Sequence, residues 1–73
     1  MPLPGSPRLT DRQRATLEAI GRGWDIAETA ERLGVARSTV ESHLKELRVK
    51  LGATSLSTLI VQGYRHGFIE IPR

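Results

Sequence analysis

Apolar residues between positions 28 and 51 follow two helical patterns separated by a short turn. In the second pattern Val40, Leu44, Leu47 and Leu51 are spaced by four, three and four residues, which places them on one stripe of a single helix. The opposite side of this helix is polar and mainly basic, and it carries Arg37, Glu41, Ser42, Lys45, Arg48 and Lys50. The pattern predicts a helix with one buried face and one charged face.

The turn between the two patterns has the spacing of a helix-turn-helix. Ala30 is followed by Gly34 four residues later and by Val40 ten residues later. Two steeply crossing helices need a small residue where their backbones approach, and the tight turn needs a residue that tolerates positive φ. Because the outer face is basic as well, this spacing favours a DNA-binding helix-turn-helix over an ordinary pair of helices.

The rest of the chain adds one helix before this unit and one after it. The pattern predicts an all-α fold, a compact four-helix bundle with helices at about 11–21, 25–33, 37–51 and 56–66. Thr10 with Gln13 has the form of a capping box, and Asp25 and Ser55 are suitable N-caps. Ala36 offers no side-chain acceptor, so the third helix should begin without a cap. Glu41–Lys45 and Glu46–Lys50 are expected to pair at i,i+4 spacing.

Composition restricts the class of function. The 73-residue chain has no cysteine and carries a net charge of +3 with a pI near 10.2, which favours a polyanionic partner. His43 and His66 have no metal-ligand spacing, and no nucleophile–base cluster or phosphate-cradling loop is present. We therefore expect no enzyme activity, no cofactor, no metal and no small-molecule ligand in this domain. The longest apolar run, residues 59–61, is too short for a membrane span, so we expect a cytoplasmic protein.

The fourth helix carries more apolar surface than one face needs. Leu56, Leu59, Ile60 and Gly63 form one stripe, while Val61, Tyr64 and Phe68 form a second. The second stripe is either a dimer surface or the seat for the tail at residues 68–71. Gly63 indicates a close approach of two segments. Trp24, the only tryptophan, is interpreted as a core residue rather than a ligand-stacking one.

Several short motifs occur together at fixed spacing. They are Leu9–Thr10–x–Arg12, Gly23, Glu28–x–Ala30–x–x–Leu33–Gly34–Val35, Thr39–Val40–x–x–His43–Leu44, Lys50–Leu51–Gly52 and His66–Gly67–Phe68–Ile69. In this combination the chain resembles the LuxR/GerE-type DNA-binding domain. The resemblance covers residues 9–69 and divides the chain into an irregular arm at 1–8, the domain at 9–69 and a tail at 70–73. The arm is either a DNA contact through Arg8 or a frayed terminus.

The resemblance implies a bacterial transcription regulator that binds double-stranded DNA as a homodimer, often through the fourth helix. It assigns Glu41, Ser42 and Lys45 to the base edges and Arg37, Ser38, Thr39, Arg48 and Lys50 to phosphates, with Val61, Tyr64 and Phe68 at the dimer interface. Glu41 either accepts from cytosine N4 or only pairs with Lys45. His43 is interpreted as a packing residue.

The chain also departs from the family pattern. Gln13, Thr29 and Ala36 stand where the family usually has Glu, Ile and Ser or Thr, and Ile26 and Leu56 replace an Asn and an Arg that touch phosphates. Part of the usual phosphate grip is therefore missing.

Two alternatives stay open. One is a domain like region 4 of a sigma factor, with RNA polymerase as a partner. The other is a protein-interaction or dimerisation module that never touches DNA. The sequence leaves open whether the chain acts alone or belongs to a larger regulator.

Overall fold

The computed structural model describes residues 7–70, and these residues form four helices. They are α1 (Asp11–Gly21), α2 (Ile26–Leu33), α3 (Arg37–Leu51) and α4 (Leu56–Arg65). The predicted four-helix, all-α fold is confirmed, with the ends of α2 and α4 each shifted by one residue. Most of the predicted arm and residues 71–73 of the predicted tail lie outside the described residues.

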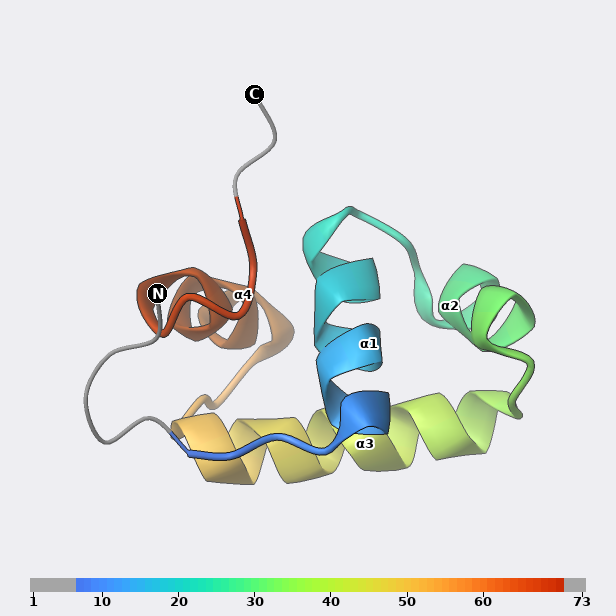
Figure 1. Ribbon diagram of the computed structural model, residues 1–73. Helices are drawn as coiled ribbons and strands as arrows, with labels where there is room; N and C mark the ends of the chain where they lie inside the picture. Colours follow the sequence, from blue (N-terminus) through green and yellow to red (C-terminus); the bar gives the residue numbers. More distant parts are fainter. Residues whose placement is uncertain (1–6, 71–73) are drawn as a thin grey trace.

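The longest helix, α3, forms the floor of the domain. α1 stands on the middle of α3, α2 and α4 lie on either side of α1, and all three are on the same side of α3 (Figure 1). α1 and α3 each pack against the other three helices, whereas α2 and α4 make no mutual contact within residues 7–70. The opposite side of α3 is therefore left to solvent.

The helix ends follow from their residues. Thr10 Oγ1 accepts from Gln13 N while Thr10 N donates to Gln13 Oε1, which completes the predicted capping box of α1. Asp25 Oδ1 accepts from Glu28 N at 2.7 Å and caps α2. Gly34 ends α2 with φ 66° and ψ 37°, a left-handed conformation that a residue with a Cβ adopts only at a cost. The predicted helix-turn-helix geometry at this turn is thus present.

The core lies where α1 and α4 meet α3. It contains Leu9, Leu17, Ile20, Ala30, Val40, Leu44, Leu47, Leu51, Ala53, Leu59, Phe68 and Ile69. All four residues of the predicted α3 stripe are among them. Burial of these side chains is the main favourable contribution to the stability of so small a domain.

Trp24 is not the core residue that the sequence suggested. Its ring is half-buried and lies outside the core cluster, with the Arg32 guanidinium 4.4 Å from the ring centroid and that of Arg22 at 5.8 Å. An aromatic face attracts a cation at this range. Trp24 therefore packs between arginine side chains at the junction of α1 and α2.

The segment after α4 folds back onto the domain. Phe68 and Ile69 are 9% and 7% exposed, and both belong to the core. A Cβ atom at Gly63 would lie 3.0 Å from Ile69 Cγ1, and one at Gly21 would lie 2.9 Å from Ile69 Cδ1. The close approach expected at Gly63 is thus with the chain's own tail. The tail therefore folds back, but Ile69 packs on Gly63 of the first stripe; of the second stripe, Phe68 is buried and Val61 stays 54% exposed.

Candidate nucleic-acid interface

The outward face of α3 carries the three residues assigned to base edges. Glu41, Ser42 and Lys45 are all exposed, and Val49 is 78% exposed. At about 100° per residue, Ser42, Lys45 and Val49 fall within about 60° of one another, on the side opposite the buried stripe. We call this set, with Glu41 at its edge, the outer stripe of α3. Val49 was not anticipated, although an apolar residue seven positions after Ser42 on a polar face is visible in the sequence.

The first turn of α3 is largely exposed to solvent. Ala36 has the extended backbone of an N-cap, but no side chain accepts from the first turn, as the sequence predicted. Arg37 and Ser38 are exposed and Thr39 is half-buried. Amides in the first turn of a helix, together with its dipole, favour an anion. This end of α3 therefore combines backbone and side-chain groups suited to a phosphate.

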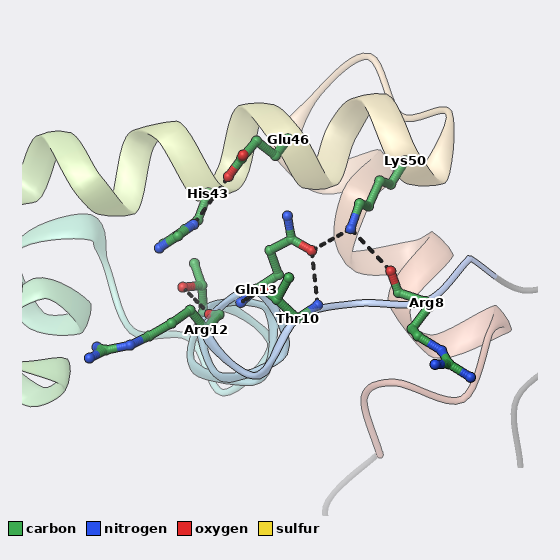
Figure 2. A network of polar contacts seen from close by, with 8 residues as sticks. Arg8, Thr10, Arg12, Gln13, His43, Glu46 and Lys50 are labelled. Atoms are coloured by element: carbon green, nitrogen blue, oxygen red, sulfur yellow. Dashed lines mark hydrogen bonds and ion pairs between the residues drawn. The ribbon is translucent and has the colours of Figure 1, made fainter.

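The end of α3 is tied to the start of α1. Lys50 Nζ donates to Gln13 Oε1 at 2.7 Å and to the Arg8 carbonyl oxygen at 3.0 Å (Figure 2). Gln13 is 5% exposed, and its Oε1 also accepts from Thr10 N. Both acceptors of Lys50 are neutral, and within residues 7–70 no acid pairs with its positive charge. In that part of the chain its third N–H has no acceptor.

Neither of the ion pairs expected along α3 forms among the described residues. Glu46 instead lies 3.2 Å from His43 Nδ1, one turn earlier, and Lys50 is held by Gln13 and Arg8. The His43 side chain is 21% exposed and is directed toward α1 (Figure 2). At Lys50 a tertiary contact has replaced the local i,i+4 pair, which contributes only about 0.3–0.5 kcal/mol, while Glu46 has taken a partner on its own helix.

A shallow groove runs beside the outer stripe of α3. Its lining residues are Ile26, Glu41, Lys45, Arg48, Val49 and Ala53. Arg48 is half-buried, and its Nε lies 3.5 Å from the Leu44 carbonyl oxygen, which holds the guanidinium against the helix. The groove is thus lined by two cationic side chains, one acidic side chain and three apolar residues. Ile26, at the site where a family Asn would touch phosphate, is one of these apolar residues.

The predicted dimer residues, two on α4 and one after it, differ in exposure. Val61 is 54% exposed, Tyr64 is half-buried and Phe68 is in the core. The Phe68 ring lies 6.0 Å from the His66 ring and 5.6 Å from the Arg14 guanidinium, so it is enclosed by its own chain. Leu56 is 41% exposed. The exposed apolar side chains of α4 are therefore Val61 and Leu56, about 140° apart around the helix.

The described residues contain no cluster of three or more potential metal ligands. Among residues 7–70, no helix has the length and apolar character needed to cross a bilayer.

Comparison with known proteins agrees with this geometry. Residues 7–62 match the GerE family, described as bacterial regulatory proteins of the luxR family, so the chain belongs to that family. The transcriptional regulatory protein MctR of Rhizobium johnstonii is 42% identical over 66 residues, which are 90% of this chain and 31% of MctR. The probable transcriptional regulatory protein NarL of Mycobacterium tuberculosis is 33% identical over 67 residues, 92% of this chain and 31% of NarL.

Solved structures of VqmA from Vibrio cholerae share the fold. A VqmA dimer without target DNA superposes with a TM-score of 0.81 at 33% identity, over 84% of this chain and 27% of VqmA. A VqmA–ligand–DNA complex gives a TM-score of 0.78 at 28% identity, over 89% of this chain and 30% of VqmA. The chain spans about a third of the length of MctR and NarL. It is a LuxR-type DNA-binding domain, and its relatives are transcriptional regulators rather than enzymes.

Proposed function

We propose that this domain binds specific sequences of double-stranded DNA as a homodimer in the cytoplasm, with α3 in the major groove. The observation that carries the proposal is the outer stripe of α3: it is exposed and, apart from Val49, polar, while the other three helices pack against the opposite face of α3. In helix-turn-helix proteins the second helix of the motif enters the major groove and its early turns contact base edges.

The side chains of the outer stripe suit base readout. Lys45 can donate to guanine O6 or N7, and Ser42 can donate or accept. Glu41 forms no ion pair with Lys45 among the described residues, so its carboxylate is open to accept from cytosine N4. We propose these three residues as the base-reading set.

The groups around the stripe suit phosphates. Arg37, Ser38 and Thr39 lie at the uncapped start of α3, Arg48 lines the groove, and Lys50 is held at the far end. Contacts of this kind set the register of a protein on the duplex without reading sequence. We propose that these five residues bind the DNA backbone.

A homodimer would place two copies of α3 on half-sites about one helical turn apart. Two exposed apolar side chains on different faces of α4, Leu56 and Val61 (with half-buried Tyr64 on the Val61 face), are candidates for contact with the second copy. Val61→Glu and Leu56→Glu, compared by sedimentation, test which of the two lies at the interface. A mass of one chain at all concentrations for the unchanged protein would contradict the dimer.

The central experiment selects bound duplexes from a random pool and then measures affinity at two salt concentrations. Lys45→Ala should reduce the preference for the selected site over random DNA, because one base contact is worth about 1–3 kcal/mol of discrimination. Lys50→Ala should weaken binding to both duplexes alike and lower the salt slope by about one unit. Equal, sequence-independent losses for both variants would contradict the assignment of Lys45 to readout. Absence of salt-dependent binding to any duplex would favour a protein-interaction module instead.

A further inference from the structure

Val49 is an apolar residue in the middle of a charged surface. It is 78% exposed, whereas the buried residues of α3 are 6% exposed or less, so the fold does not use its side chain. Lys45, one turn earlier, lies next to it on the outer stripe, and Lys45 and Arg48 line the same groove as Val49. A residue at this exposed position contacts any molecule that binds to the outer stripe of α3.

Val49 lies near the end of α3, beyond the early turns proposed to contact base edges, so it would meet base pairs further along the groove. At about 1.5 Å per residue, Val49 lies about 10 Å beyond Ser42, which corresponds to about three base-pair steps. In the major groove, the apolar group that a base pair presents is the 5-methyl group of thymine, and small aliphatic side chains contact it. The cations on both sides of Val49 match a polyanion and oppose an apolar protein surface.

From this placement we infer that Val49 is a specificity-determining residue that contacts the 5-methyl group of a thymine in each half-site. The inference rests on the proposed binding of α3 in the major groove. It adds a base preference at the end of the half-site that lies beyond Lys45. A valine at this position is then compatible with DNA binding by the surrounding basic residues, because the thymine methyl group that it contacts is uncharged.

The test removes only the methyl group from DNA. In a duplex taken from the selected pool, each thymine is replaced singly by uracil, which keeps every hydrogen-bonding group of thymine. For the unchanged protein, one replacement in each half-site should lower affinity about fourfold, the effect of losing one buried methyl group. Because the homodimer loses the contact in both half-sites, Val49→Ala should bind the thymine duplex about sixteenfold more weakly (4 × 4) and be less sensitive to that replacement.

Glu31→Ala is the control, because Glu31 is also an exposed helical residue but lies on α2 and has no part in the proposed DNA or dimer contacts. It should keep the uracil sensitivity of the unchanged protein, and circular dichroism should show the same helix content for all three proteins. Uracil effects of equal size in Val49→Ala and the unchanged protein, or no uracil effect at any position, would overturn the inference while sequence-specific binding stands. Failure to select any duplex would remove the proposed function as well as the role of Val49.

Discussion

Thr29 holds a buried hydroxyl group without a hydrogen-bond partner. The residue is 0% exposed in α2, and among residues 7–70 its Oγ1 is a buried side-chain oxygen with nothing to bond. Replacing Thr29 with Val keeps the β-branched shape and exchanges the hydroxyl for a methyl group. We expect Thr29→Val to stabilise the domain.

The size of the effect follows from two contributions. A buried polar group left unsatisfied costs about 1–3 kcal/mol, and burying the added methyl group contributes up to about 0.8 kcal/mol. Because the site is closely packed and the methyl group is slightly larger than the hydroxyl, we expect a gain near the lower end, about 1–2 kcal/mol. In a domain of this size each kcal/mol raises Tm by about 4–8 °C.

Thr16 provides a matched control for this prediction. It is also 0% exposed and helical, but its Oγ1 donates to the Arg12 carbonyl oxygen at 2.8 Å. Thr16→Val removes that bond and should destabilise the domain by about 0.5–1.5 kcal/mol. Thermal unfolding followed by circular dichroism measures both variants. A lower Tm for Thr29→Val, or equal changes for the two variants, would refute the argument from the unsatisfied hydroxyl.

Three further variants test other contacts by the same measurement. Lys50→Met should lower stability by about 1 kcal/mol through loss of its hydrogen bonds to Gln13 and Arg8. An unchanged Tm would mean that these two bonds do not stabilise the domain. Ala36→Ser should raise stability by about 0.5–1 kcal/mol by supplying the missing cap of α3, and no gain would mean that the start of α3 cannot use one. Gly63→Ala should lower the stability of the domain because the new Cβ would meet the side chain of Ile69. The loss of stability should be smaller in an Ile69→Val background, which lacks Cδ1. An equal loss of stability in both backgrounds would exclude that clash.

The parts of the fold that depend on neighbouring residues were predictable from the sequence. The Thr10–Gln13 capping box, the left-handed Gly34 and the missing cap at Ala36 all involve residues within four positions of one another. The buried stripe of α3 follows from its period alone. Local chemistry and periodicity were therefore sufficient for the helices and for the polar face that makes up the candidate site.

Contacts between distant residues were not predictable in the same way. Lys50 was expected to pair with Glu46, but it bonds to Gln13, 37 positions away, because its long side chain reaches the start of α1, which packs on α3 (Figure 2). The surroundings of Phe68 depended on whether the tail folds back, which the apolar pattern of α4 left undecided. Trp24 was expected in the core because it is a large aromatic residue, but its ring packs against two arginine side chains. The assignments of individual residues to bases and phosphates stay predictions.

The fold-back of Ile69 has a consequence for synthesis on the ribosome. Its side chain reaches Gly21 at the end of α1 and Gly63 within α4, so the first helix completes its packing only with a residue made 48 positions later (69 minus 21). At elongation rates of about 5–20 residues per second, that interval lasts several seconds. During this time the apolar surface of α1 beneath Ile69 is uncovered, so the nascent domain can interact with chaperones until residue 69 has emerged.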